Sequence, residues 1–439
     1  MRVCASLGAA ADALAAGGAD LTEVRLDLTG GRVPPVTGET LVTYRGPVDL
    51  NVLPAGYRGL IDIGEEPLPK TDLRIVRSHH DYEGTPAADT IAARLNGAEP
   101  FVYLTKGAYT VQSFRDLDSI FKASQQIERR HVLFGMGEFG AVTRLRTGLL
   151  KNEFSFGYVS TPTAPGQFSV KQMKELGDDC FITGIVGRPV AKSLSPTMHN
   201  AAFAAAHIPG IYLRFAAESL DGIAEVIREY GLTGVNVTVP YKQQIIPYLD
   251  RMTADAETIG AVNTVINNRG RLSGENTDIV GILTALRRAG FAPAAGKKVL
   301  ILGSGGAARA CVYVLRQHSC RVTVAARNAV TAEKLAQDLG SETLTPAAAK
   351  ADDYDLVVNC TPIGMYGNGP YPADLSGLHA GQTVLDMVYG STTPLVQQAQ
   401  AAGCRIASGQ DMLVGQGAAS FELWTGIGRM DQVMREAIE

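Results

Sequence analysis

Short apolar runs separated by helical patterns dominate the first part of the chain. Runs of strand length lie at 3–6, 24–28, 41–44, 60–63, 75–76, 101–104, 132–134 and 154–158. The segments 9–16, 90–95 and 114–128 between them have the apolar spacing of helices. This alternation predicts a compact (β/α)8 barrel over 1–172. Because glycine and proline interrupt 46–58 and 64–74, we expect no good helix in these two connections.

A different pattern begins at residue 297, where an apolar run leads into a glycine cluster and then into a helical stripe. Val299 to Leu302 carry no polar side chain, as a strand buried on both faces requires. Residues 307, 311, 314 and 315 then line one face of a helix. A second apolar strand over 321–326 completes a βαβ unit. We therefore predict a doubly wound Rossmann domain over 284–410.

The glycine cluster has the pattern of a phosphate-binding loop. Gly303 permits a tight turn, and Gly305 lets a pyrophosphate approach the backbone at a helix N-terminus. Where a site for NAD places Asp or Glu against the ribose, the second strand ends in Ala326 and Arg327. Arginine at that point favours a 2′-phosphate, and hence NADP. The alternative is a doubly wound domain with an incidental surface arginine.

Polar residues interrupt the apolar segments between 181 and 283. Ser195 could cap the helix that has Pro196 in its first turn, but capping does not explain Ser193, and the two hydroxyls could together hold a small anion. Alternation places Asn236 and Thr238 on one strand face.

Three more polar positions in this region have a structural as well as a functional interpretation. Asn263 is a polar residue inside a predicted strand, and Lys242 on its own would be a solvated charge. Thr277 or Asp278 could simply cap the following helix.

Composition and charge narrow the classes of function. At 439 residues the chain exceeds one ordinary core, so it should form two or three domains. The net charge of −4 is spread without long basic or acidic runs, which gives no footprint for nucleic acid or a membrane surface. The start of the chain has no secretory apolar core, and the six cysteines have no Cys-x-x-Cys spacing, so we expect a cytoplasmic protein with reduced thiols. The seven histidines show no ligand spacing, so no metal site is expected.

The barrel segment resembles type I 3-dehydroquinate dehydratase. The matching segments are Glu-Val-Arg-Leu-Asp at 23–27, Ser-His-His-Asp-Tyr at 78–82, Gly-Met at 135–136 with Thr-Arg-Leu at 143–145, and Ala-Pro-Gly-Gln at 164–167. The resemblance implies that His80 transfers protons. It places the substrate among Glu23, Arg25, Arg45, Arg144 and Gln167.

This segment departs from the family at two positions. The family forms an imine between the substrate ketone and a lysine on strand six. Aligned on Met136, the place of that lysine falls near Tyr103, and we expect Lys106, three residues on, to face the other way. A family glutamate expected after Asp62 is replaced by Gly64. A degenerate barrel and an active dehydratase therefore both stay open.

From about residue 181 onward, the chain resembles the shikimate dehydrogenase family. The motifs are Ser-Leu-Ser-Pro at 193–196, Asn-Val-Thr-Val-Pro-Tyr-Lys at 236–242, Ala-Val-Asn-Thr at 261–264, Asn-Thr-Asp at 276–278 and Asn-Cys-Thr-Pro-Ile-Gly-Met at 359–365. The resemblance implies a substrate domain over 180–283, completed by a terminal helix at about 411–439, and an NADP domain over 284–410. The implied reaction is the reversible reduction of 3-dehydroshikimate to shikimate.

The same resemblance assigns roles to single residues. Lys242 and Asp278 would form the catalytic pair. The implied substrate-binding residues are Ser193, Ser195, Asn236, Thr238, Asn263, Tyr389 and Gln416. The implied cofactor-binding residues are Gly303, Ser304, Gly305, Gly306, Ala307, Arg327, Asn328, Met387 and Gly409.

Other functions compatible with the sequence are a bifunctional enzyme that dehydrates 3-dehydroquinate and reduces the product, a quinate dehydrogenase, and a non-catalytic NADP-binding protein. The expected partners are small-molecule substrates, and the sequence does not set an oligomeric state.

Overall fold

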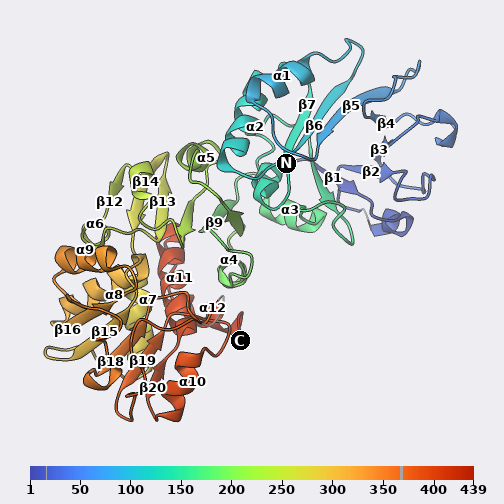
Figure 1. Ribbon diagram of the computed structural model, residues 1–439. Coiled ribbons are helices and arrows are strands. Elements are labelled where there is room, and N and C mark those ends of the chain that lie inside the picture. The colour runs from blue at the N-terminus through green and yellow to red at the C-terminus, as the bar shows by residue number, and fades with distance from the viewer. Residues whose placement is uncertain (16, 366–368) are drawn as a thin grey trace. The chain divides into compact units, whose positions relative to one another are not determined.

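A computed structural model describes residues 1–15, 17–365 and 369–439 of the chain (Figure 1). Contacts within the chain divide it into two compact units. The first unit consists of Met1–Ala191 and His207–Thr233, and the second consists of Lys192–Ala206 and Gly234–Glu439.

The first unit contains the predicted barrel, an eight-stranded parallel sheet in the order β7-β6-β5-β4-β3-β2-β1-β8. Its strands are β1 Val3–Ser6, β2 Leu21–Arg25, β3 Glu39–Thr43, β4 Leu60–Ile63, β5 Arg74–Asp81, β6 Leu104–Thr110, β7 His131–Met136 and β8 Ser155–Tyr158. Each strand contributes at least one side chain to a single core cluster, among them Leu21, Leu60, Leu104 and Phe156. The prediction of a (β/α)8-type barrel is confirmed.

The barrel has few regular helices, as the breakers in its connections predicted. They are η1 Ala10–Ala15, η2 Leu50–Val52, α1 Ala88–Asn96, α2 Phe114–Gln126, η3 Phe139–Leu145 and α3 Val170–Leu176, in which η denotes a 3₁₀ helix. Neither 46–58 nor 64–74 forms an α-helix. The helix predicted over 9–16 is the 3₁₀ helix η1, and residue 16 lies outside the described residues.

Two predicted strands begin at the wrong residue. The second strand begins at Leu21 rather than at residue 24, and the sixth begins at Leu104, where the predicted strand ended. Phe101 belongs to the preceding loop and is 66% exposed. The apolar run that includes Phe101 resembles a strand in sequence although most of it precedes the sheet. Because side chains alternate along a strand, Lys106 lies on the same face of β6 as Leu104 and Ala108.

The first unit also contains β9 Phe181–Gly187 and β10 Gly210–Ala216, which pair in parallel, and α5 Ile223–Glu229. Helix α5 lies close to barrel helix α2. A Cβ on Gly222 would stand 3.2 Å from the backbone nitrogen of Arg115, and the Tyr230 hydroxyl donates to the carbonyl of Leu117 at 2.8 Å. The segment 207–233 thus packs directly on the barrel.

A carboxyl pair between α2 and α5 makes the stability of this packing depend on pH. Burial and the neighbouring Asp118 carboxylate raise the pKa of Glu229 from 4.5 to about 7. The folded chain therefore binds more protons than the unfolded chain between these pH values, and its stability falls as the pH rises through them. We expect Glu229→Gln to raise the melting temperature at pH 8 but not at pH 4. Thermal melts across this range test the prediction, with the exposed Glu225→Gln on the same helix as control.

The second unit begins with α4 Ser195–Ala205 and continues with a small sheet and its helices. These are β11 Gly234–Val237, η4 Ile246–Tyr248, β12 Arg251–Met252, α6 Ala254–Ile259, β13 Thr264–Asn268, β14 Arg271–Glu275 and α7 Asp278–Arg288. Strand β13 is antiparallel to both β11 and β14. This pairing brings the end of β11 beside the start of β13, near the start of α7.

A six-stranded parallel sheet in the order β17-β16-β15-β18-β19-β20 forms the rest of this unit. The elements are β15 Lys298–Leu302, α8 Gly306–Gln317, β16 Arg321–Ala325, α9 Ala329–Leu339, β17 Glu342–Leu344, η5 Ala351–Asp353, β18 Leu356–Asn359, β19 Thr383–Asp386, α10 Pro394–Ala401 and β20 Arg405–Ala407. Val299 and Ile301 pack in the cluster with α7, α8 and α9, whereas Leu300 and Leu302 pack with α10. The predicted doubly wound domain is confirmed.

The chain ends in α11 Gly409–Thr425 and α12 Asp431–Glu436. The terminal segment, predicted as one helix, thus forms two, because Gly426 adopts a left-handed conformation (φ 75°) that ends α11. The boundaries 1–172, 180–283 and 284–410 stay a prediction. None of the described helices is both long and apolar enough to cross a membrane.

Candidate functional site

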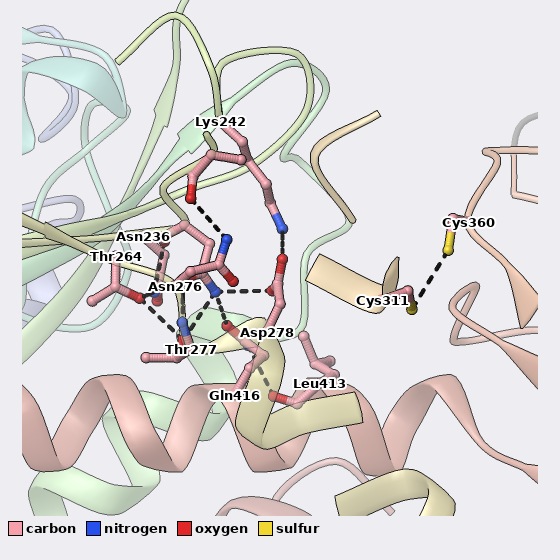
Figure 2. A network of polar contacts seen from close by, with 12 residues as sticks. Asn236, Lys242, Thr264, Asn276, Thr277, Asp278, Cys311, Cys360, Leu413 and Gln416 are labelled. Atoms are coloured by element: carbon pink, nitrogen blue, oxygen red, sulfur yellow. Dashed lines mark hydrogen bonds and ion pairs between the residues drawn. The ribbon is translucent and has the colours of Figure 1, made fainter. Parts of the chain in front are cut away.

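Lys242 and Asp278 form an ion pair in the second unit (Figure 2). The ammonium nitrogen of Lys242 lies 2.5 Å from Oδ2 of Asp278, and the two side chains are 14% and 2% exposed. The interpretation of Lys242 as a solvated charge is therefore wrong. Asp278 is the first residue of α7, its carboxylate faces the lysine, and the helix has no side-chain cap, so the capping interpretation is also wrong.

Asn263 holds the other oxygen of Asp278. Its amide nitrogen donates to Oδ1 of Asp278 at 2.9 Å, and its amide oxygen accepts from the backbone nitrogen of Thr277 at 2.7 Å. Asn263 lies just before β13 rather than inside a strand as predicted. An amide and an ammonium together fix the position of this buried carboxylate.

A network of buried hydroxyl groups supports these residues (Figure 2). The Ser420 hydroxyl accepts from Nδ2 of Asn236 at 2.9 Å and lies 2.9 Å from Oγ1 of Thr264. Oγ1 of Thr277 lies 3.1 Å from the same Ser420 oxygen. No role in the site was predicted for Thr264, Thr277 or Ser420. The one available signal was Ser420, which lies one turn after Gln416 on the buried face of α11.

Gln416 joins this network, and Thr238 follows the strand that carries Asn236. Gln416 accepts from Nδ2 of Asn263 at 3.3 Å and donates to the carbonyl of Leu413 at 2.9 Å. Thr238 is half-buried, one residue beyond the end of β11. Asn236, Asn263 and Gln416 thus lie together in one hydrogen-bonded network.

The paired serines lie at the start of α4, although not in the predicted way. Helix α4 begins at Ser195, and its N-cap position is Leu194, which has no side-chain cap. Ser193 is the residue whose hydroxyl accepts a helix-start amide, that of Ser195, at 3.3 Å. Both serines are buried, at 9% and 3% exposure.

The glycine loop has the shape that a pyrophosphate needs. Gly303 has a φ of 111°, and a Cβ there would lie 3.2 Å from Cγ2 of Thr361. At Gly305, the N-cap of α8, the space where a Cβ would stand is open. The backbone amides at the start of α8 are therefore accessible to an anion.

Gly306 connects this loop to the ion pair. A Cβ on Gly306 would lie 3.0 Å from Cβ of Lys242, so the lysine stem packs tightly on the loop at this glycine. A ring bound beyond the pyrophosphate would thus have an ammonium beside it.

Where the adenosine ribose of a dinucleotide would lie, just beyond β16, the chain has an arginine and no acidic residue. Arg327 is exposed just beyond β16, after Ala325 and Ala326. Asn328 caps α9 by accepting from the backbone nitrogen of Thr331 at 3.2 Å, and Ser304 is hydrogen-bonded to the Thr331 hydroxyl at 2.7 Å. These residues fit a 2′-phosphate, and hence NADP.

A buried carboxyl group orders the loop that contains Met387 and Tyr389. Asp386 accepts from Asn359 at 2.9 Å, from the Val388 nitrogen at 3.0 Å and from the Thr393 hydroxyl at 2.5 Å. Burial raises the pKa of Asp386 despite these hydrogen bonds. A Cβ on Gly409 would lie 2.5 Å from the Val388 carbonyl, so the start of α11 packs tightly against the same loop.

A second cluster of charges lies inside the barrel. Lys106 is on β6, on the same inward face as Leu104 and Ala108, and is 3% exposed. Its ammonium lies 2.8 Å from Oδ2 of Asp62 and 3.5 Å from Oε1 of Glu23. The expectation that Lys106 faces away from the interior is wrong, and so is the placement of the family lysine at Tyr103, which precedes β6.

The charge of Lys106 lowers the pKa of two neighbours, the carboxyl group of Glu23 and the imidazole of His80. Burial alone would raise the pKa of Glu23, but the Lys106 ammonium and the hydroxyl of Ser6 outweigh it and lower that pKa. Burial, Lys106 and Arg45 lower the pKa of His80 to about 2, so its imidazole is neutral. Arg45 lies 3.1 Å from Nε2 of His80.

The other predicted barrel residues divide into two groups. Arg144 is 1% exposed, and its Cζ atom lies 4.5 Å from the centre of the Phe134 ring. Burial lowers the pKa of the Arg144 guanidinium to about 10. Arg25 instead pairs with Asp27 at 2.6 Å, and Gln167 accepts from the backbone nitrogens of Thr163 and Ala164 in its own loop. Gly64, where the family has glutamate, faces open space.

Within the described ranges, no group of three or more His, Cys, Asp and Glu side chains is placed to hold a metal ion.

Family models match four parts of the chain. They are type I 3-dehydroquinase at 63–178, the shikimate dehydrogenase substrate binding domain at 185–265, shikimate / quinate 5-dehydrogenase at 285–364 and the shikimate 5′-dehydrogenase C-terminal domain at 409–439. The matches follow the order of the barrel, the small sheet, the parallel sheet and the terminal helices.

Similar proteins match the part of the chain beyond the barrel. The shikimate dehydrogenase (NADP(+)) of Geobacter sp. (strain M21) is 43% identical over 273 residues, which cover 58% of this chain and 94% of that protein. The crystal structure of shikimate dehydrogenase from Aquifex aeolicus is 33% identical, with a TM-score of 0.56, over 59% of this chain and 98% of that one. The enzyme from Thermus thermophilus, solved with NADP(H) and shikimate, is 33% identical, with a TM-score of 0.53, over 58% and 98%.

Proposed function

The chain belongs to the shikimate dehydrogenase family, and we propose that it reduces 3-dehydroshikimate to shikimate with NADPH, reversibly, at the Lys242–Asp278 pair. The observation that carries this proposal is the 2.5 Å ion pair packed on the glycine loop at Gly306. A ketone bound there would have its oxygen beside an ammonium and its carbon beside the nicotinamide ring.

The protein's part in the reaction is to hold the ketone and manage one proton. Bound NADPH supplies the hydride. The Lys242 ammonium stabilises negative charge on the substrate oxygen and passes it a proton. Asp278, fixed by Asn263, orients the ammonium and accepts from a substrate hydroxyl.

The remaining polar residues sort by the group that each would bind. We assign binding of the substrate carboxylate to Ser193 and Ser195. The substrate hydroxyls would be bound by Asn236, Thr238, Asn263, Tyr389 and Gln416. For the cofactor, we assign the pyrophosphate to 303–307, the 2′-phosphate to Arg327 beside Asn328, and the nicotinamide side to Met387 and Gly409. A pocket of amides and hydroxyls discriminates against analogues that lack a partner group.

The test of this function is NADP⁺ reduction by the full-length chain with shikimate or quinate as substrate. We expect a higher kcat/KM with shikimate, because the relatives reported above are shikimate dehydrogenases. A higher kcat/KM with quinate would favour the quinate dehydrogenase alternative, and the absence of turnover with both would favour a non-catalytic NADP-binding protein.

Arg327 should set the preference for NADP. We expect Arg327→Ala to raise the KM for NADP⁺ about tenfold, because a charge-assisted hydrogen bond at an exposed site contributes roughly 1.5 kcal/mol. The KM for NAD⁺ should change little, since NAD⁺ has no 2′-phosphate. Steady-state kinetics with both cofactors measures this, and Arg321→Ala, at the other end of β16, is the control. Equal losses with both cofactors would contradict the assignment.

The barrel supports a second function, the dehydration of 3-dehydroquinate, which would supply the substrate of the reduction. The observation that favours it is Lys106, buried inside the barrel between Asp62 and Glu23. A lysine there can form an imine with the substrate ketone, and a protonated imine acidifies the neighbouring carbon. His80 has the neutral imidazole that a proton acceptor needs, although a pKa of about 2 makes it a weak base in the substrate-free chain.

The other barrel residues have distinct roles in this second proposal. Arg144 would bind the substrate carboxylate. Glu23 would balance the charge of the imine. Arg45 would orient His80, which it contacts. Arg25 and Gln167 would bind substrate only after leaving their present partners, Asp27 and the loop at Thr163.

A further inference from the structure

The connection between β7 and β8 contains no α-helix, only the short 3₁₀ helix η3. These strands stand at the two ends of the sheet order, and Asn152, three residues before β8, pairs with β7 at His131. Its side chain accepts from the backbone nitrogen of Leu133 at 2.7 Å and donates to the Leu133 carbonyl at 2.8 Å. The connection carries Arg144 in the short 3₁₀ helix η3. The position of Arg144 therefore depends on whatever else holds this segment.

Arg146 holds it to parts of the chain outside the barrel. The guanidinium is buried, with the residue 8% exposed, and donates to the carbonyls of Tyr230 at 2.8 Å, Asp178 at 2.5 Å and Cys180 at 3.0 Å. Asp178 and Cys180 follow α3, and Tyr230 follows α5. Since a buried guanidinium is costly without partners, these carbonyls fix it in one place.

The carboxylate of Asp178 strengthens the same junction. It accepts from the backbone nitrogens of Thr147 at 2.7 Å and Gly148 at 2.8 Å. A Cβ on Gly148 would lie 2.9 Å from this carboxylate, which shows how closely the two segments pack. Residues 146–148 are therefore attached to the segment after α3 through both side chain and backbone.

An aromatic cluster anchors the other end of η3. The ring of Phe139 lies 5.0 Å from that of Phe114 on α2 and 5.3 Å from that of Phe215 on β10, edge to face in both cases. All three side chains are buried. Arg144 lies between this cluster and Arg146 along the chain, so both flanks of its segment are held by residues of 178–233.

We propose that Arg146 is a positioning residue for the barrel site: it attaches the β7–β8 connection to 178–180 and 230–231, and so places Arg144 over the substrate. The proposal rests on the dehydratase function given above. The segment 207–233, which precedes β11 of the dehydrogenase half, thereby forms part of the structure of the barrel. The ion pair of Arg115 and Asp221 links the same two segments, but its side chains are 73% and 50% exposed, so it should contribute little.

The test compares Arg146→Met with the control Arg115→Met in the full-length chain. We expect Arg146→Met to raise the KM for 3-dehydroquinate about tenfold, because Arg144 loses its fixed position, and to lower kcat less. Reduction of 3-dehydroshikimate by the same variant should keep its kcat. Arg146→Lys, which keeps the charge and part of the hydrogen bonding, should restore part of the lost affinity, whereas Arg115→Met should behave as the wild type.

Hydrogen exchange separates this proposal from the dehydratase function on which it rests. Amides of 139–154 should exchange at least roughly tenfold faster in Arg146→Met than in Arg115→Met, whether or not the barrel is active. If the first variant does not fold, Asp178→Ala tests the same junction, since it removes two backbone contacts and keeps Arg146. Unchanged exchange together with an unchanged KM would overturn the role of Arg146. Faster exchange in a chain without dehydratase turnover would refute the dehydratase function and leave the attachment itself established.

Discussion

Replacing Lys242 by alanine is expected to lower kcat for the reduction of 3-dehydroshikimate by about 10²- to 10⁴-fold, the usual range for a lost general acid. The ammonium is 2.5 Å from Asp278 and packs on Gly306, so no other cation in the described part of this site has the same two neighbours. The KM for substrate should change much less than kcat, because the serines and amides that we assign to binding are untouched. Steady-state NADPH oxidation by the purified variant measures both constants.

A second lysine in the same unit provides the control. Lys297 pairs with Asp355 at 2.8 Å, but both side chains are as exposed as those of a surface pair, at 43% and 37%. Lys297→Ala should keep the kcat of the wild type. If Lys242→Ala kept its turnover while its melting temperature was unchanged, a different group would have to donate the proton.

Borohydride reduction in the presence of 3-dehydroquinate is expected to fix the substrate carbon skeleton covalently onto Lys106. An imine at that position would be reduced to a stable secondary amine, which peptide mass spectrometry locates. Lys106→Met should abolish both the label and the dehydratase activity, since the electron sink for proton abstraction is lost. This should be the largest effect of any substitution in the barrel, beyond the range expected for His80→Ala.

The matched control is Lys174→Met. Lys174 also pairs with an aspartate of the barrel, Asp20 at 2.6 Å, but outside the interior. The Lys174→Met variant should keep the full label on Lys106 and the full dehydratase activity. A label on another lysine would contradict the role of Lys106. No label at all, in a wild-type chain that reduces 3-dehydroshikimate, would show that the barrel is kept for structure and not for dehydration.

The sequence predicted both parallel sheets because their strands are apolar on the faces that pack. Leu300 and Leu302 face one layer and Val299 and Ile301 the other, and this pattern cannot be satisfied on a solvated sheet. The ion pair was also predictable, although only through the family motifs, since neither Lys242 nor Asp278 differs from a surface residue or a helix cap by its local pattern.

The position of the family lysine on the sixth strand was the main error of the sequence prediction. Placing it at Tyr103 put Lys106, three residues on, on the opposite face, because side chains alternate along a strand. The error arose at Phe101 and Tyr103, whose loop is as apolar as a strand. Tyr103 lies there under the guanidinium groups of Arg74 and Arg130, at 5.3 and 4.9 Å, a contact that no local pattern indicates.

The hydroxyl network could not be predicted for a different reason. Thr264, Thr277 and Ser420 come from β13, the start of α7 and α11, and each is an ordinary residue in its own segment. They meet only because Gly281 and Gly415 let α7 and α11 pack closely, with a Cβ on Gly281 only 2.5 Å from the Met412 carbonyl. Their role depends on tertiary packing, which local periodicity does not determine.

The most direct test of the central claim is the stoichiometry and product of the forward reaction. The full-length chain is mixed with 3-dehydroshikimate and NADPH, and the product is identified by mass spectrometry while NADPH is followed by absorbance. We expect one NADPH consumed for each molecule of a product that is two hydrogens heavier than the substrate and co-elutes with shikimate. NADPH that stays unconsumed with a folded wild-type chain, or a product other than shikimate, would contradict the account.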